Sequence, residues 1–237
     1  YSTVSNGYNN SASSYYSFVG NGCQNRNIGS YSSIINGTLN CNCNQHSLIG
    51  GGCCNTISGY LDNASFQLNS IVGGCCNCII SYASFIGGGT CNTISGYFGD
   101  GYNCSPFSVI VGGYRNYVDQ LYKCFSTIVG GCSNSSCGSF SFIGGGEGNL
   151  VCGYSVVTGG AYNVSGGTYS TVSGGYYNCA ANEFSGVASG TRNLVAGFDS
   201  FIGGGCYNCI NNLSGWSAIL SGYVNRTYCN YSSVLGG

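Results

Sequence analysis

A glycine recurs along the whole chain at a near-constant interval, and no other feature constrains the fold as strongly. Segments such as 84–89 (SFIGGG) and 170–175 (STVSGG) share one pattern that ends on a glycine. Fifteen copies are found, and nine of the fourteen intervals between their last glycines are 15 residues. A fixed short period of this kind indicates a repeat architecture. The anchoring glycines are Gly7, Gly22, Gly37, Gly52, Gly74, Gly89, Gly113, Gly131, Gly146, Gly160, Gly175, Gly190, Gly205, Gly222 and Gly237.

Other positions of the repeat are as constant as the glycine. Five residues before it stands Ser in fourteen of fifteen copies, and six before it stands an aromatic residue in eleven. Three residues before it is always Ile or Val, which we call the core column: Val4, Val19, Ile34, Ile49, Ile71, Ile86, Ile110, Ile128, Ile143, Val157, Val172, Val187, Ile202, Ile219 and Val234. Three residues after it is always Asn, which we call the Asn column: Asn10, Asn25, Asn40, Asn55, Asn77, Asn92, Asn116, Asn134, Asn149, Asn163, Asn178, Asn193, Asn208 and Asn225.

These columns predict an all-β fold, a parallel β-solenoid (β-roll) of about fifteen 15-residue coils in a single domain over 1–237. Ser and Ile/Val two residues apart share one face of a strand, and β-branched residues favour that half-buried setting. Fifteen residues are too few for a strand with a crossover helix, but they fit two short strands and two turns. Stacked coils place each column in register about 4.8 Å apart. The Ile/Val column then forms a thin core, and the Asn column is expected to bond coil to coil as amide ladders do.

The segments 1–7 (YSTVSNG), 169–175 (YSTVSGG) and 92–97 (NTISGY) resemble the head repeats of trimeric autotransporter adhesins, the YadA-like head, and the related β-roll repeats of phage and viral tail fibres. The resemblance covers nearly the whole chain. It implies a left-handed coil and three chains packed as a trimer. The chain departs from that family in being rich in Tyr and Cys, and it contains no stalk heptad or membrane anchor.

Three longer intervals predict loop insertions at about 58–68, 96–106 and 117–124. Extra residues in a solenoid map to loops at one corner. These intervals hold five of the eleven charged residues, namely Asp62, Asp100, Arg115, Asp119 and Lys123. The loops are interpreted either as a lateral surface that contacts a ligand or a neighbouring chain, or as solvated insertions that the fold tolerates.

The 18 cysteines also follow the repeat. Residues of one column on adjacent coils lie at a distance that suits a disulfide, so Cys53–Cys75 and Cys137–Cys152 are candidate bonds within the chain. Bonds between chains remain an equal alternative. Abundant disulfides favour an oxidising location, which means extracellular, on a cell surface or on a virion surface. A metal site is the weaker interpretation: Cys41 and Cys43 are close in sequence, but the spacing typical of zinc ligands is missing. We therefore expect no metal and no cofactor.

The sequence offers no catalytic set, and we expect the chain not to be an enzyme. The single histidine, His46, occupies a position of the aromatic column and has no nucleophile paired with it by motif. Charged residues make up 5% of the chain and the net charge is −1, which argues against nucleic-acid binding. No run of about 18 apolar residues is present, so we expect no membrane insertion by a helix.

The function predicted is structural or adhesive, as part of an extracellular or virion-surface fibre. The expected partners are copies of the chain itself, as a trimer or an end-to-end polymer, because the repeats continue to both ends of the sequence without a capping unit. A surface glycan or a receptor is a further candidate partner. Two alternatives stay open: a subunit of a self-stacking filament or sheath, and a carbohydrate- or ice-binding solenoid. Mixed side chains before the core column, such as Thr3, Phe18 and Leu48, argue against ice binding.

Overall fold

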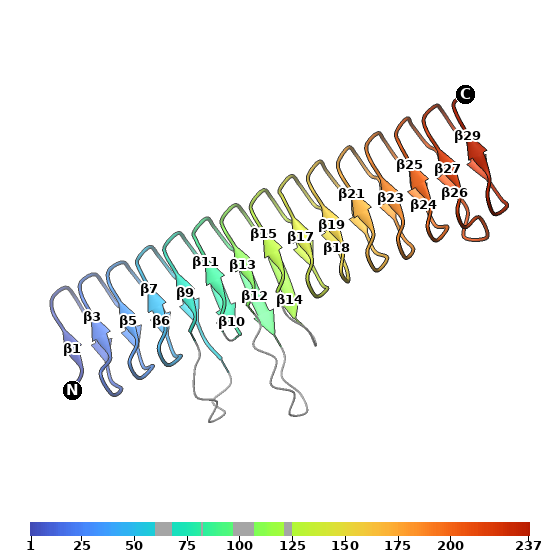
Figure 1. Ribbon diagram of the computed structural model, residues 1–237. Helices are drawn as coiled ribbons and strands as arrows, with labels where there is room; N and C mark the ends of the chain where they lie inside the picture. Colours follow the sequence, from blue (N-terminus) through green and yellow to red (C-terminus); the bar gives the residue numbers. More distant parts are fainter. Residues whose placement is uncertain (60–67, 82, 97–106, 121–124) are drawn as a thin grey trace. The chain divides into compact units, whose positions relative to one another are not determined.

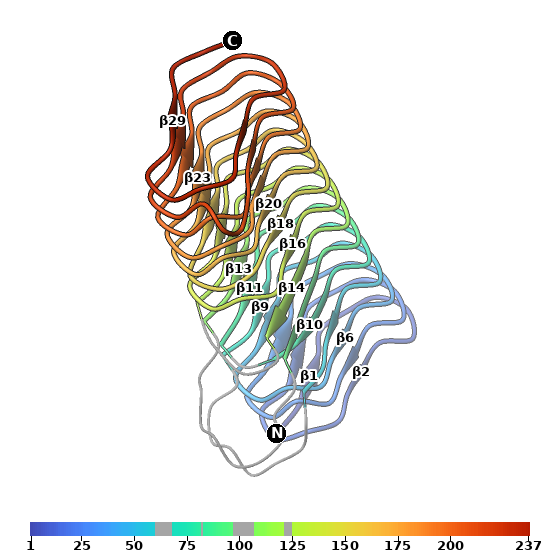
Figure 2. The same ribbon diagram turned by 90° about the vertical axis from the view of Figure 1, so that its right-hand side faces the viewer.

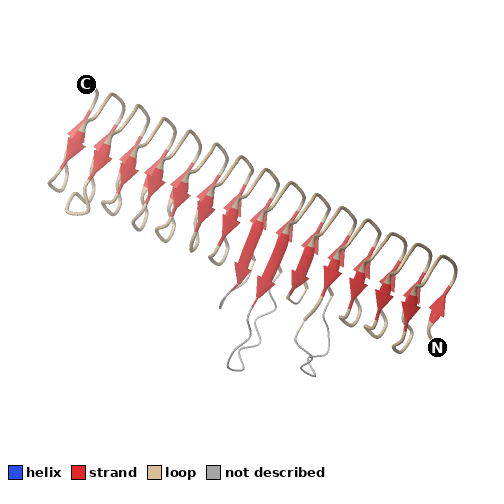
Figure 3. Ribbon diagram, turned by 180° about the vertical axis from the view of Figure 1, so that it is seen from behind, coloured by secondary structure: helices blue, strands red, loops and turns tan. Residues whose placement is uncertain are grey.

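Each repeat of the sequence forms a coil of a parallel β-solenoid, as predicted. The computed structural model describes residues 1–59, 68–81, 83–96, 107–120 and 125–237 (Figure 1). No helix occurs among these residues (Figure 3). The chain divides into two compact units, Tyr1–Phe125 and Ser126–Gly237, each built from the same coil. The single domain over 1–237 and the left-handed coil stay predictions.

The first unit contains two parallel sheets, and consecutive strands alternate between them (Figure 2). The odd-numbered strands carry the core column, and the even-numbered strands follow the Asn column. One sheet is formed by β1 (Thr3–Val4), β3 (Phe18–Val19), β5 (Ser33–Ile34), β7 (Leu48–Ile49), β9 (Ser70–Ile71), β11 (Phe85–Ile86) and β13 (Val109–Ile110). The other is formed by β2 (Ser11–Ala12), β4 (Arg26–Asn27), β6 (Cys41–Asn42), β8 (Thr56–Ile57), β10 (Cys78–Ile80), β12 (Thr93–Gly96) and β14 (Tyr117–Gln120).

The second unit repeats this arrangement with the same alternation of strands. Its odd-numbered strands are β15 (Thr127–Ile128), β17 (Phe142–Ile143), β19 (Val156–Val157), β21 (Thr171–Val172), β23 (Gly186–Val187), β25 (Phe201–Ile202), β27 (Ala218–Ile219) and β29 (Ser233–Val234). Its even-numbered strands are β16 (Ser135–Ser136), β18 (Leu150–Val151), β20 (Val164–Ser165), β22 (Cys179–Ala180), β24 (Leu194–Val195), β26 (Cys209–Ile210) and β28 (Arg226–Thr227).

Strand register follows the sequence columns even where an interval departs from 15 residues. Ile49 pairs with Ile71 across the 22-residue interval, and Ile86 pairs with Ile110 across the 24-residue one. The third predicted loop is wrong at its start, because 117–120 form β14, which pairs with β12 from Thr93 to Gly96. Extra residues therefore lengthen two neighbouring strands, each of which supplies hydrogen-bond partners to the other. The second predicted loop is also wrong at its first residue, Gly96, which ends β12, whereas 58–59 and 68 lie outside the strands as predicted. The remaining positions of the predicted insertions, 60–67, 97–106 and 121–124, lie outside the described residues.

The core column lies inside the coils, as predicted. Its members from Val19 to Ile219 are at most 1% exposed. Val4 and Val234, on the first and last strands, are the exceptions: Val4 is exposed and Val234 is half-buried. The facing wall adds a second buried set at the second residue of the even-numbered strands, including Ile57, Ile79 and Val195. A coil thus buries about one aliphatic side chain from each sheet, and its stability depends on the neighbouring coils.

Candidate functional site

The Asn column is buried from Asn25 to Asn208 and bonds coil to coil, as predicted, but its partners are mainly backbone atoms. The amide of Asn163 donates to the carbonyl oxygens of Gly159 and of Gly175 on the next coil, both at 3.0 Å. Its Oδ1 accepts the backbone N–H of Asn178 at 2.9 Å. Contacts between two Asn side chains occur only at some steps, such as Asn25 to Asn10 at 3.1 Å. At this turn the Asn side chains therefore provide the hydrogen bonds between coils that backbone groups provide within the strands. Without them, these backbone groups would lack partners.

Replacing Asn163 with alanine tests this role. The substitution removes the acceptor of the buried Asn178 N–H and one donor to each of two carbonyl groups. We expect a loss of about 2 kcal/mol in unfolding free energy, measured by urea denaturation, because an unsatisfied buried donor costs about 1–3 kcal/mol. The control Asn211→Ala removes one exposed hydrogen bond, to the N–H of Leu213, and should change stability by less than about 0.5 kcal/mol. Equal losses in the two variants would contradict the role.

The aromatic column forms an exposed stack of rings on each unit. In the second unit, Phe140, Tyr154, Tyr169 and Phe184 follow one another with ring centroids 5.1, 5.5 and 5.2 Å apart. Phe140, Tyr169 and Phe184 are each a little over half exposed. The planes of adjacent rings differ by 10° to 35°, so each ring covers part of the face of the next. We call these four residues the aromatic ladder.

The first unit carries a comparable stack, and its last ring is an imidazole. Tyr16 lies 5.1 Å from Tyr31, and Tyr31 lies 5.1 Å from His46 with an interplanar angle of 6°. His46 thus takes the place of an aromatic ring, in agreement with its position in the repeat. Most ring-bearing residues of this column have positive φ, for example 53° at Tyr16 and 60° at Tyr169. This left-handed conformation is uncommon outside Gly, Asn and Asp, and no pattern in the sequence indicated it.

The aromatic ladder is interrupted where Asp199 takes the position of the next ring. A hollow of about 320 Å³ lies there, between Phe184 and Phe201 on successive coils. Gly186 lines this hollow, and its lack of a side chain leaves space there, since an added Cβ would lie 3.1 Å from the ring of Phe201. The lining residues are Tyr169, Thr171, Phe184, Ser185, Gly186, Asp199, Ser200 and Phe201. This hollow combines uncovered ring surface with one carboxylate.

A second aromatic cluster, which was not predicted from the sequence, lies at the turn after the anchoring glycines of the second unit. Tyr162 stacks on Tyr177 at 5.0 Å, and its hydroxyl donates to Glu147 at 2.8 Å, which raises the pKa of Tyr162. The guanidinium of Arg192 lies 5.8 Å from the ring of Tyr177 and 5.3 Å from the ring of Tyr207. Recurrent tyrosines one and two residues after the glycine were the available signal. Tyr162, Tyr177 and Tyr207 thus already have charged partners.

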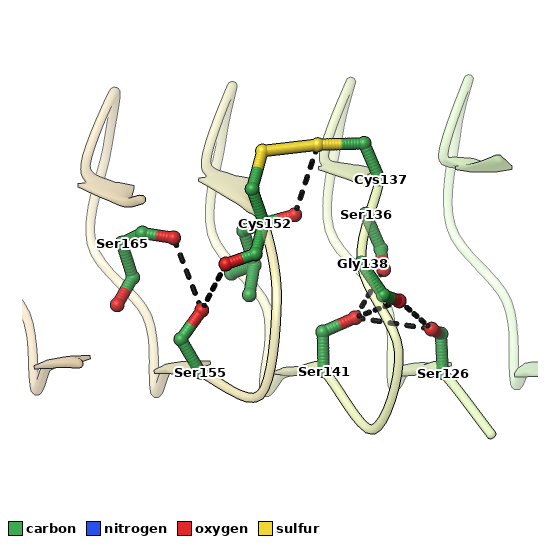
Figure 4. Close-up of a disulfide and its surroundings, with 9 residues drawn as sticks. Ser126, Ser136, Cys137, Gly138, Ser141, Cys152, Ser155 and Ser165 are labelled. Carbon is green, nitrogen blue, oxygen red and sulfur yellow. Dashed lines mark hydrogen bonds between the residues drawn. A yellow bond between two sulfur atoms is a disulfide. The ribbon is translucent and has the colours of Figure 1, made fainter. Parts of the chain in front are cut away.

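The predicted Cys137–Cys152 disulfide is present and joins adjacent coils (Figure 4). Its Cα atoms are 4.9 Å apart, and the backbone N–H of Cys137 donates to Val151 beside it. Beneath it, the buried Ser136 and Ser141 are hydrogen-bonded, and Ser141 also donates to Gly138 at 3.1 Å. The bond therefore lies beside a part of the second core wall where two buried serines, Ser136 and Ser165, flank the buried Val151.

The predicted Cys53–Cys75 disulfide is wrong, because both residues carry free thiols. Their backbones pair across adjacent coils, so the predicted register is correct. The next residue is again a cysteine in both coils, and each sulfur contacts that neighbour: Cys53 to Cys54 at 3.3 Å, and Cys75 to Cys76 at 3.4 Å. The left-handed conformation of Cys54 and Cys76 turns each pair of sulfurs together within its own coil.

Neither a metal group nor a membrane-spanning helix is found in the described part of the chain. No three or more His, Cys, Asp or Glu side chains there are placed to hold a metal ion. No helical segment there has the length and apolarity needed to cross a bilayer. A search of protein-family models finds no match, and a search of curated proteins finds no similar sequence.

Proposed function

We propose that the chain is a non-enzymatic structural protein of an extracellular or virion-surface fibre, which associates with copies of itself through the aromatic ladder. The observation that supports this most is the run of four exposed rings at 5.1–5.5 Å spacing. Exposed apolar surface in a continuous stripe is typical of interaction sites. With a net charge of −1, the chain has little electrostatic repulsion against a second copy.

The spacing of the aromatic ladder favours a second copy as the partner. Its period comes from the distance between coils, and another solenoid of this chain offers the same period. Because stacked rings cover one another's faces, they present mainly edges and hydroxyl groups outward. Edge contacts suit interdigitation with another row of rings. A sugar ring would instead need an open aromatic face, which the interior of the ladder does not offer.

The association is tested by measuring mass with light scattering over a range of concentrations. We expect oligomers of the unsubstituted chain, with three copies favoured by the resemblance of its repeats to YadA-like heads. The double variant Phe140→Asn/Phe184→Asn should dissociate about a hundredfold more readily. Removing two half-exposed rings from an interface costs roughly 3 kcal/mol, and about 1.4 kcal/mol corresponds to a tenfold change. Asn accepts the positive φ of 51° found at both positions.

The matched control is Tyr177→Asn/Tyr207→Asn, which removes two rings of similar exposure and conformation from the second cluster. Its association should equal that of the unsubstituted chain. A monomer at all concentrations would refute self-association, and equal weakening in both double variants would place the contact elsewhere. Open-ended growth of the oligomer would favour the filament alternative over a closed fibre subunit.

Carbohydrate binding is the second candidate, and the hollow beside Asp199 is the observation that favours it. Here the ladder ends, and no ring of the described residues stacks on Phe184 on the side toward Asp199. An open ring face with a carboxylate nearby suits the apolar face and the hydroxyl groups of a sugar. Ice binding has no such support, since the outward residues of the odd-numbered strands range from Gly186 to Phe201.

A further inference from the structure

Cys41 on β6 and Cys43, which directly follows this strand, form a close dithiol in the first unit. Asn42 between them points inward and is fully buried, so Cys41 and Cys43 lie together on the outer face, as alternation along a strand requires. Their sulfur atoms are 3.6 Å apart. The backbone on both sides is fixed, because the N–H groups of Cys41 and Cys43 donate to Asn55 and Ile57 on the next coil at 2.9 and 2.8 Å.

An arginine lies opposite this pair on the neighbouring coil. Arg26 is the register partner of Cys41 in the sheet, and Thr56, on the other side, is uncharged. The thiol of Cys43 donates to Cys41, and Arg26 attracts and hydrogen-bonds the same sulfur; together they lower the pKa of Cys41 to about 6, against the effect of burial. The pKa of Cys43 is raised by its hydrogen bond to Cys41, then by burial and by the Cys41 charge. One proton is therefore shared between the two sulfurs at neutral pH.

The other close cysteine pairs of the first unit behave differently. Hydrogen bonding within the pair, burial and neighbouring thiolates raise the pKa of Cys54 and of Cys75 to about 11. No cation is among the groups that act on these two thiols. Proximity of two sulfurs alone thus does not produce a thiolate at neutral pH, and the arginine in register with Cys41 distinguishes this site.

We propose that Cys41 and Cys43 form a thiol–disulfide exchange site, in which Cys41 attacks a disulfide and Cys43 resolves the product. The Cys41 thiolate attacks one sulfur of a small disulfide, the S–S bond breaks, and the leaving thiolate takes a proton from water. Cys43 then loses its proton and attacks Cys41, which releases the second small thiol. Starting from the Cys41 thiolate, the two cysteines lose two electrons and their one remaining proton, and the small disulfide gains these two electrons, that proton and one proton from water.

The internal disulfide formed in this way is expected to be readily reduced again. Residues two apart in a strand have Cα atoms about 6.6 Å apart, at the upper end of the range that disulfides span. Strained and exposed disulfides are the labile ones that take part in exchange. By contrast, the Cα atoms of Cys137 and Cys152 lie 4.9 Å apart on adjacent coils, well within the range that disulfides span. We therefore expect this bond to have a structural role.

The site is tested by brief alkylation with iodoacetamide at pH 6, followed by peptide mapping of the reduced full chain. Cys41 should react about tenfold faster than Cys209, which has the same place in its coil and Arg226 in register but no second thiol. The rate of alkylation of Cys41 should exceed the rates of Cys54 and Cys75 by about a hundredfold. This factor allows for the lower nucleophilicity of a low-pKa thiolate. The pH dependence of Cys41 labelling should have its midpoint near pH 6, and Arg26→Gln should move the midpoint upward.

Glutathione disulfide then tests the second step. The unsubstituted chain should lose two hydrogen atoms from the peptide that carries Cys41 and Cys43, without retaining glutathione. The variant Cys43→Ser should instead keep a mixed disulfide with glutathione at Cys41. A stable mixed disulfide in the unsubstituted chain would refute Cys43 as the resolving group. Labelling of Cys41 no faster than that of Cys209 would refute the site altogether.

Discussion

Replacing Gly175 with alanine is expected to destabilise the second unit by at least about 3 kcal/mol. Gly175 has a φ of +90°, which side-chain-bearing residues rarely adopt, and such strain costs roughly 1–3 kcal/mol. An added Cβ would also overlap the carbonyl oxygen of Gly190 and lie 2.5 Å from Nδ2 of Asn178. Relieving the overlap requires the next coil or the Asn column to move. Because Asn178 donates to Gly174 and Gly190 at 2.9 and 2.8 Å, the damage extends across two coils.

The preceding glycine provides the matched control. Gly174→Ala adds the same methyl group one residue earlier, where nothing lies within 4 Å of the new Cβ and φ is not positive. We expect a change of no more than about 0.5 kcal/mol. Urea denaturation followed by far-UV circular dichroism measures both variants. If both alanines were tolerated equally, the glycine repeat would reflect composition and not the turn geometry.

The columns of the sequence predicted the solenoid because they record the environment of each position once per coil. A β-branched residue at every core position leaves few alternatives to a buried strand, and register followed directly, as in the pairing of Val172 with Val187. The pattern could not predict which atoms meet. The Asn column was expected to bond amide to amide, but the φ of its turn brings backbone groups of the next coil nearer to Nδ2 and Oδ1.

Cysteine chemistry was predictable in position but not in bonding. Cys53 and Cys75 have the same column relation as Cys137 and Cys152, yet only the latter pair is bonded. The difference lies in local geometry: Cys53 and Cys75 precede residues with positive φ, whereas Cys137 and Cys152 follow strands. The sequence placed Cys41 and Cys43 close together and suggested only a metal site for them, because their partner Arg26 is 15 residues away in the sequence. Comparing residues of one column on successive coils would have found it.

Replacing Ile202 with alanine is expected to cost about 4 kcal/mol of unfolding free energy. Ile202 is fully buried and pairs with Val187 and Ile219 on the neighbouring coils. Loss of such an aliphatic side chain costs about 2–5 kcal/mol, and more where the surroundings cannot collapse into the cavity. Here the backbone is held on both sides: Ala188 donates to the carbonyl of Ile202, and Gly203 donates to that of Ile219, both at 2.9 Å.

The neighbouring residue of β25 separates core packing from simple loss of apolar area. Phe201 precedes Ile202, points outward and is 44% exposed. Although Phe201→Ala removes more atoms, we expect it to cost about 1 kcal/mol, because the ring lies at the surface and its loss leaves no enclosed cavity. Ile202→Val, which removes one methylene group, should also cost about 1 kcal/mol. Thermal and urea midpoints of the three variants give this order directly. If Phe201→Ala lost as much unfolding free energy as Ile202→Ala, the outer face of β25 would also have to be packed. The proposed association of copies would explain this only if the loss depended on protein concentration.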